Sequence, residues 1–191
     1  ESVVVTRMHG LAFIALAVLA TGCAQLKATP YAAAYEALDR LKASKPASVA
    51  VVKVQPTDPN DPVNNLTLRG ARLISPSGTF AKYLEDALVN DLKEDSAYDA
   101  KSGPRIDARI HNNEISVANI VTGTGAMEVQ IEVTREGAQR LKKIYKANTS
   151  FESSFAGIVA IPAGQAAYSD LVRTLLRQVY SDPQFTAALA S

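Results

Sequence analysis

The sequence has very little cysteine, histidine or tryptophan, and it contains no long run of one charge sign. Its single cysteine, Cys23, excludes an internal disulfide. Lysine and arginine total 20 against 19 aspartate and glutamate residues, and the two signs are interspersed. The electrostatic footprint of a nucleic-acid-binding protein is therefore absent. With 47% hydrophobic residues, the 191-residue chain can bury a core without disulfide support.

Motifs for catalysis or cofactor binding are also scarce. His111 is the only histidine after Cys23, and one imidazole without neighbouring ligands does not form a zinc site. Residues 122–125 contain a Gly-x-Gly pattern, but they lack the third glycine of a dinucleotide-binding loop. No Gly-x-Ser-x-Gly nucleophile motif is present. We therefore expect a protein that is not an enzyme, with no catalytic residues, metal or cofactor, and with His111 at the surface or a strand end.

The longest apolar run is short and lies near the start of the sequence. Residues 11–20 are all apolar, and ten residues are too few to cross a bilayer as a helix, which requires about 20. They fit the hydrophobic region of a signal peptide, and Arg7 supplies the positive charge before it.

The only cysteine follows this run. Residues 19–23 read Leu-Ala-Thr-Gly-Cys, which resembles the lipobox of bacterial lipoproteins, with leucine one residue further from the cysteine than usual. The resemblance implies cleavage after Gly22 and acylation of Cys23, for example with palmitate; several acyl chains hold a protein to a membrane far more firmly than one. The alternatives are an ordinary signal peptide with an incidental cysteine and an uncleaved membrane helix, which the length disfavours. Alanine, not aspartate, follows Cys23, which by analogy favours the periplasmic face of the outer membrane.

The chain divides into three parts on this interpretation. Residues 1–22 are a lipoprotein signal peptide, residues 23–47 are a tether that could include a short helix, and residues 48–191 are a single α/β domain.

Within the domain, β-branched residues 48–55 predict a buried strand, and residues 66–74 predict a short one. Residues 77–94 have one apolar face and predict a helix capped by Ser75 or Ser77. Its Glu85 and Asp86 are expected on the solvated face.

Three alternating segments predict an antiparallel meander. They cover residues 105–117, with a bulge at Asn112 and Asn113, then residues 127–133 and residues 145–151. We expect turns at residues 122–125 and at Glu136 and Gly137.

A second helix is predicted at residues 165–180. The apolar residues 155–164 before it are either a buried connection or an exposed patch that docks lipid or protein. The expected fold is α+β: a two-layer sandwich with a mostly antiparallel sheet and two amphipathic helices packed on one face.

Two further segments carry a family resemblance. Residues 75–84 read Ser-Pro-Ser-Gly-Thr-Phe-Ala-Lys-Tyr-Leu, and residues 182–185 read Asp-Pro-Gln-Phe. With the lipobox, they resemble a family of uncharacterised proteobacterial envelope lipoproteins. The element order is more distantly similar to the LPS-assembly lipoprotein and to auxiliary lipoproteins of ABC lipid transporters, which implies a non-catalytic partner in lipid or lipopolysaccharide transport.

Two functions stay open at this point. The first is an outer-membrane-anchored periplasmic lipoprotein that acts as an accessory or assembly partner of an envelope complex. It would contact the membrane through its lipid anchor, and it would bind a protein partner but no nucleic acid. The alternative is a periplasmic binding module for a lipid or other apolar ligand, held between the helices and the sheet, where an apolar cavity would support it.

Overall fold

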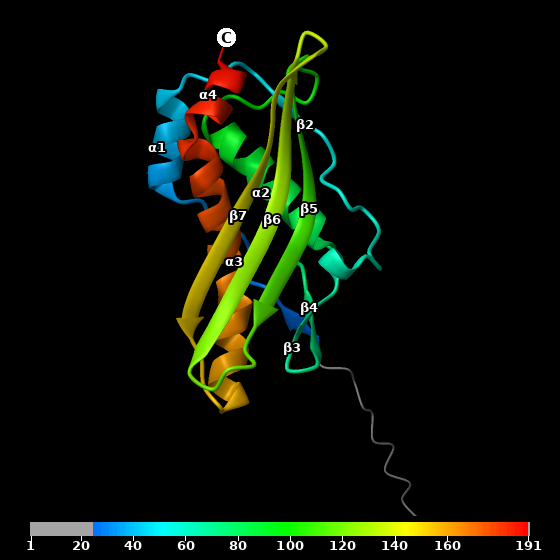
Figure 1. The fold of residues 1–191 in the computed structure, drawn as a ribbon, viewed down its shortest axis with the longest axis vertical. Helices are drawn as coiled ribbons and strands as arrows, with labels where there is room; N and C mark the ends of the chain where they lie inside the picture. Colours follow the sequence, from blue (N-terminus) through cyan, green and yellow to red (C-terminus); the bar gives the residue numbers. More distant parts are fainter. Residues whose placement is uncertain (1–24, 191) are drawn as a thin grey trace, which may run out of the picture.

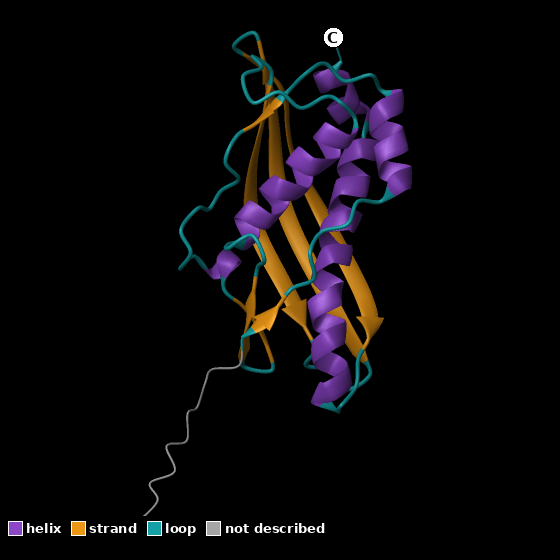
Figure 2. Ribbon diagram, turned by 180° about the vertical axis from the view of Figure 1, so that it is seen from behind, coloured by secondary structure: helices purple, strands orange, loops and turns teal. Residues whose placement is uncertain are grey.

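The computed structural model describes residues 25–190 and places a layer of helices over one face of a four-stranded sheet (Figures 1 and 2). This main sheet has the order β2-β5-β6-β7, with β2 (Ala50–Val51), β5 (Arg105–Ser116), β6 (Thr122–Arg135) and β7 (Ala138–Glu152). A smaller sheet has the order β1-β4-β3, with β1 (Leu26–Lys27), β3 (Leu66–Leu68) and β4 (Ala71–Ile74). The helices are α1 (Tyr35–Ala43), α2 (Phe80–Glu94), α3 (Gly157–Ser181) and α4 (Pro183–Leu189), and a 3-10 turn, η1, covers Pro62–Asn64.

The α+β arrangement with helices on one face is observed, but the finer prediction is wrong in two respects. The described residues contain four α-helices instead of two, and both sheets are mixed. β2 runs parallel to β5 and β1 runs parallel to β4. Two parallel neighbours need a crossover connection, and α2 lies between β2 and β5 in the chain. Of the extra helices, α1 is the short helix that the sequence allowed within residues 23–47, and α4 has only 7 residues, which is too short for a clear helical period.

Helix α2 begins later than predicted because Thr79 caps it. The Thr79 hydroxyl accepts a hydrogen bond from the Lys82 amide at 3.0 Å, whereas Ser75 and Ser77 lie in the preceding turn. Glu85 also departs from the prediction of a solvated residue, since its carboxylate accepts the Val54 amide at 3.0 Å. This contact fixes α2 to the chain that follows β2.

The long strands form the predicted antiparallel meander, with β6 between β5 and β7. The bulge lies one residue earlier than expected: Ile110 and Asn112 pair with consecutive residues of β6, so His111 is the extra residue. The second turn is at Glu136 and Gly137, as predicted, and both residues have the positive φ of a type I′ hairpin, 50° and 74°.

The turn predicted at residues 122–125 is wrong, because these residues belong to β6 and the chain reverses at residues 117–121. The two glycines are instead needed for close packing against side chains of β7. A Cβ on Gly123 would lie 2.2 Å from the Phe151 ring, and a Cβ on Gly125 would lie 2.6 Å from Thr149 Oγ1. Glycine inside a strand often marks such a close approach.

The structure differs from the prediction in two segments that were each expected to form one strand, residues 48–55 and residues 66–74. Within residues 48–55 only Ala50–Val51 form a strand, and the chain then follows β5 through separate bonds, such as Gln55 N–H to the Ala108 carbonyl at 2.9 Å. Residues 66–74 form a hairpin of β3 and β4, whose turn residues Arg69 and Gly70 have φ values of 49° and 81°.

The segment that precedes the predicted domain packs closely against it. Within residues 26–43, Ala28 and Leu41 are buried, and α1 packs on α3. The Tyr31 hydroxyl donates to the Asp91 carboxylate at 2.8 Å, and the Thr29 carbonyl accepts from the Tyr83 hydroxyl at 2.8 Å. The described part of the predicted tether is therefore bound to α2 and α3.

The core lies between the helices and the main sheet. Side chains that are completely buried there include Leu84, Leu88, Ile106, Val129, Ile131, Leu171 and Leu175. Aromatic rings join α2 to α3, with the Tyr168 ring centroid 4.5 Å from that of Phe80 and 5.1 Å from that of Tyr83.

Candidate functional site at one end of the molecule

Three connections and the first described strand gather at one end of the elongated molecule, the lower end in Figure 1. The connections are the turn between β3 and β4, the loop at residues 117–121 between β5 and β6, and the loop at residues 153–156 between β7 and α3. The C-terminal end of the described chain and the β6–β7 turn lie at the opposite end (Figures 1 and 2). We call the lower end the anchor end, because the segment predicted to carry the lipid anchor precedes β1 in the sequence.

Strand β1 directs the start of the described chain toward this end. It pairs in parallel with β4, with Leu26 opposite Leu73, so its N-terminal end points back along β4 toward the turn at Arg69 and Gly70. Two residues separate Cys23 from Leu26 in the sequence. The Cα atoms of Cys23 and Leu26 can therefore be no more than about 11 Å apart.

Side-chain and backbone bonds hold the loops of the anchor end together. The Arg69 guanidinium donates hydrogen bonds to the carbonyls of Ser154 and Phe155, which joins the β3–β4 turn to the β7–α3 loop. The Ser153 amide donates to the Val121 carbonyl at 2.9 Å, which joins that loop to the β5–β6 loop. The anchor end is thus a connected surface built from segments far apart in the sequence.

Exposed apolar side chains are concentrated on two of these loops and on the first turn of α3. Ile120 and Val121 are 59% and 70% exposed, and Phe155, Ile158 and Val159 are 78%, 86% and 53% exposed. We call these five residues the apolar tip. Among the described residues, the other exposed large apolar side chains are Tyr35 on α1 and Ile144 on β7. Of the two predictions for residues 155–164, the exposed patch therefore applies to their first part, while Ala160 and Gly164 are buried in α3.

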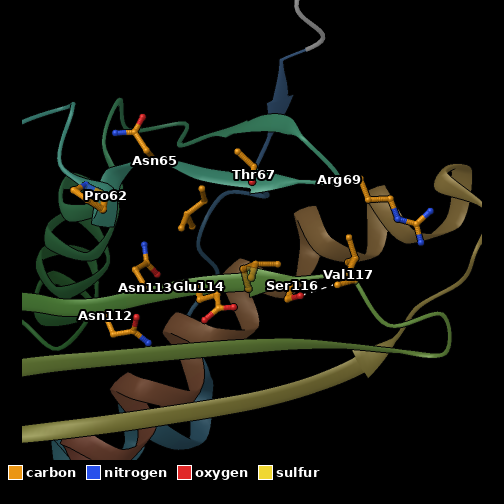
Figure 3. Close-up of a pocket in the computed structure, with 12 residues that line it drawn as sticks. Pro62, Asn65, Thr67, Arg69, Asn112, Asn113, Glu114, Ser116 and Val117 are labelled. Carbon is orange, nitrogen blue, oxygen red and sulfur yellow. Dashed lines mark hydrogen bonds between the residues drawn. The ribbon is translucent and has the colours of Figure 1, made fainter.

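A cleft of about 500 Å³ lies beside the apolar tip, between β3 and β5 (Figure 3). Asn65, Thr67 and Arg69 border it along β3, and Asn112 and Glu114 border it along β5. Asn113 crosses the gap at one end, where its side-chain amide donates to the Val63 carbonyl at 3.0 Å.

The cleft has polar walls but no arrangement typical of catalysis. Glu114 is its one carboxylate and Arg69 its one cation, and neither histidine nor cysteine lines it. The walls can donate and accept hydrogen bonds, so the cleft suits a polar segment better than an apolar ligand.

A buried carboxylate lies far from this cleft, in the helical layer. Asp91 is 1% exposed, and its Oδ2 accepts hydrogen bonds from the hydroxyls of Tyr31 and Tyr180, both at 2.8 Å. Burial raises the pKa of Asp91 to about 6, although the two hydroxyls oppose the increase. The sequence analysis missed this residue. Its spacing could have revealed it, because Asp91 is four residues after Ala87 and three after Leu88, on the apolar face of α2.

Of the residues that the sequence singled out, the structure describes His111 but not Cys23 or Gly22. Cys23 and Gly22, predicted for lipidation and cleavage, lie outside the described residues. His111 is exposed on β5 at the bulge, as expected for a surface histidine.

Across residues 25–190, no three His, Cys, Asp or Glu side chains come together as a metal site requires. None of the helices in this range is long and apolar enough to cross a membrane.

The chain matches no family model, and no curated protein matches its sequence. Solved structures share its fold at low sequence identity. A DUF330-family protein from Xanthomonas campestris has a TM-score of 0.50 and 11% identity, covering 81% of this chain and 90% of that one. The hypothetical protein CT253 from Chlamydia trachomatis has a TM-score of 0.50 and 10% identity, covering 75% and 99%. A protein from Caulobacter crescentus, described as a putative lipoprotein, has a TM-score of 0.47 and 13% identity, covering 82% and 98%. The first two similarities show that this chain has a fold found in other bacterial proteins.

Proposed function

We propose that this protein is a lipoprotein anchored through Cys23 to the periplasmic face of the outer membrane. In this proposal it catalyses no reaction and acts as an accessory or assembly partner of an envelope complex. The observation that carries the proposal is the position of Cys23, which closely follows a signal-peptide-like run and is separated by two residues from the first strand of the fold. Acyl chains at that position would hold the folded domain close to the bilayer.

The polar face of the main sheet supports a role in protein contacts. It lies opposite the helices (Figure 2) and carries cross-strand ion pairs, Lys142 with Glu132 at 2.7 Å and Lys146 with Glu128 at 2.8 Å. These side chains are partly exposed, so their net contribution to stability is small. A face of this kind remains available to a partner with complementary charges.

The alternative function, a binding module for a lipid or other apolar ligand, finds less support. We expected such a ligand between the helices and the sheet, where fully buried side chains such as Leu88 and Leu175 fill the space. The cleft beside β3 has the required size, but polar side chains line much of it.

Metabolic labelling with a palmitate analogue tests the anchor. We expect the wild-type protein to incorporate the label and to sediment with outer membranes, and we expect Cys23→Ser to lose the label, because the acylated thiol is absent. If the wild type were as unlabelled as Cys23→Ser, the proposal would be wrong.

The same pair of proteins tests the accessory role. Crosslinking in native membranes, followed by mass spectrometry, should recover a defined envelope protein with the wild type, and much less of it with Cys23→Ser. Equal recovery from both proteins would show that anchoring does not bring the partners together.

A further inference from the structure

We propose that the apolar tip contacts the lipid bilayer directly, so that the domain stands on the membrane with its anchor end inserted. This inference rests on the proposed anchoring through Cys23. Lipidation alone does not require the five residues of the apolar tip to be apolar, and this proposal gives them a role.

The first argument is the position of the tip relative to the anchor. Cys23 can lie no more than about 11 Å from Leu26, and β1 points toward the anchor end. Residues 26–31 are bonded to the body of the protein; for example, Gln165 Nε2 donates to the Lys27 carbonyl at 2.7 Å. They therefore cannot serve as a flexible spacer. A membrane that holds Cys23 must therefore lie close to the loops of this end.

The second argument is the composition of two of those loops, the β5–β6 and β7–α3 connections; the third, the β3–β4 turn, carries Arg69. Residues 115–127 and residues 153–169 contain no aspartate, glutamate, lysine or arginine. Each stretch includes a loop of the anchor end (Figure 1). Moving these loops into the headgroup region would thus desolvate no ionised side chain of either stretch, which is the largest cost of membrane insertion.

The third argument is the exposure of the tip residues themselves. Five large apolar side chains are exposed at this end, two in the β5–β6 loop, one in the β7–α3 loop and two in the first turn of α3, with Ile158 86% and Phe155 78% exposed. Exposed apolar side chains that gather on one part of a protein surface mark a protein or membrane contact. The bilayer is the occupant that the neighbouring anchor brings within reach.

The fold also holds the tip in a fixed position. The Arg69 guanidinium donates hydrogen bonds to the carbonyls of Ser154 and Phe155. Without Arg69, these two carbonyls would lose their hydrogen bonds to water when the loop enters the membrane, and they would need other donors. The Val121 carbonyl is satisfied by the Ser153 amide. These bonds lower the number of backbone groups that insertion would leave without a partner.

Tryptophan fluorescence on vesicles tests the proposal. The chain contains no tryptophan and one cysteine, so a single introduced tryptophan reports on its own position and the Cys23 thiol remains free for coupling. The chain from Cys23 onward, which includes all described residues, would be coupled to a maleimide-bearing lipid. The vesicles would consist of phosphatidylethanolamine and phosphatidylglycerol, with or without brominated acyl chains.

We compare Ile158→Trp at the tip with Gln139→Trp, an exposed position near the β6–β7 turn at the opposite end. Side chains at the headgroup–acyl boundary lie about 5–10 Å deep. We therefore expect brominated lipid to quench Ile158→Trp by roughly twofold and to leave Gln139→Trp unchanged. Val121→Trp should behave like Ile158→Trp. Equal quenching at both ends, or quenching at neither, would overturn the proposal.

The outcomes of the two proposals can be told apart. Chemical coupling replaces enzymatic acylation, so a failure of palmitate labelling in cells would disprove the lipoprotein proposal without changing the vesicle result. Normal palmitate labelling with an unquenched Ile158→Trp would instead disprove only the membrane contact of the tip.

Discussion

At the scale of single residues, Asp91 has the strongest consequence for stability. Folding removes its carboxylate from water and provides two tyrosine hydroxyls to one oxygen, while Oδ1 has no hydrogen-bond partner among residues 25–190. The uncompensated part of the desolvation cost raises its pKa from 3.8 to about 6. An acid with a raised pKa binds its proton more strongly in the folded state, so ionisation at neutral pH destabilises the fold.

We expect the contribution of Asp91 to the free energy of unfolding to be most favourable below about pH 4 and to fall as the pH rises to about 6, where the folded-state group ionises. The loss amounts to roughly 3 kcal/mol for a shift of this size. Asp91→Asn should remove most of this pH dependence, because the amide does not ionise. Urea unfolding at several pH values between 4 and 7 would measure it.

Asp86→Asn is the matched control, since Asp86 lies on the same helix with a 41% exposed side chain. Its ion pair with Lys82 is exposed and contributes little, so the pH profile should keep its shape. If Asp91→Asn retained the full loss between pH 4 and 6, another group would be responsible.

At the scale of elements, Gly164 determines how closely the smaller sheet approaches α3. A Cβ at this position would lie 2.9 Å from both methyl groups of Leu68 on β3 and 3.4 Å from a methyl group of Val117. The helix and the hairpin therefore pack across a position that has no side chain. This contact helps to hold the hairpin, and with it Arg69, at the anchor end.

Gly164→Val should destabilise the protein by about 1–3 kcal/mol, because the new side chain overpacks a filled contact. Chemical denaturation would measure the change. Gly103→Val is the control, since no atom lies within 4 Å of its Cβ position, and its effect should stay within about 0.5 kcal/mol. Similar effects of the two substitutions would show that the close contact does not limit packing.

The sequence predicted the elements with a clear period and missed those that depend on distant contacts. The face of α2, the alternation of β6 and the turn at Gly137 follow from local patterns. By contrast, Gly123 and Gly125 have the composition of a turn, and only the approach of Phe151 and Thr149 on β7 explains them as strand residues. The parallel pairing of β2 likewise depends on where α2 returns the chain.

The candidate site was predictable only in part. The sequence distinguished an apolar segment at residues 155–164 but could not separate its exposed start from its buried continuation, because both are apolar. Ile120 and Val121 join the apolar tip only through the pairing of β6 with β7. The cleft depends on the hairpin of β3 and β4, which a single-strand prediction for residues 66–74 could not produce.

At the scale of the whole molecule, the folded unit includes the segment that precedes residue 48. Leu41 is fully buried, Ala37 is 3% exposed, and Tyr31 contributes one of the two bonds to Asp91. Removal of this segment would expose the apolar surfaces of α2 and α3 that it covers and leave the buried carboxylate with one donor.

A chain that begins at Ser48 should therefore be less stable than one that begins at Ala24, by several kcal/mol, on the order of the cost of deleting two or more buried side chains. Urea midpoints and near-ultraviolet circular dichroism would compare the two chains. The chain from Ala24 keeps every described residue and serves as the control. Equal midpoints would show that residues 26–47 add nothing to the fold.

The docked start of the chain also determines how a partner would meet this protein. If Cys23 carries the anchor and the apolar tip lies in the bilayer, as proposed, the domain could rotate about the membrane normal and diffuse laterally, but it could hardly tilt. The polar face of the sheet would then point parallel to the membrane plane, at a constant height above the lipid. A partner in the same membrane would find it by a search in two dimensions, after part of the translational and rotational entropy of association had already been lost.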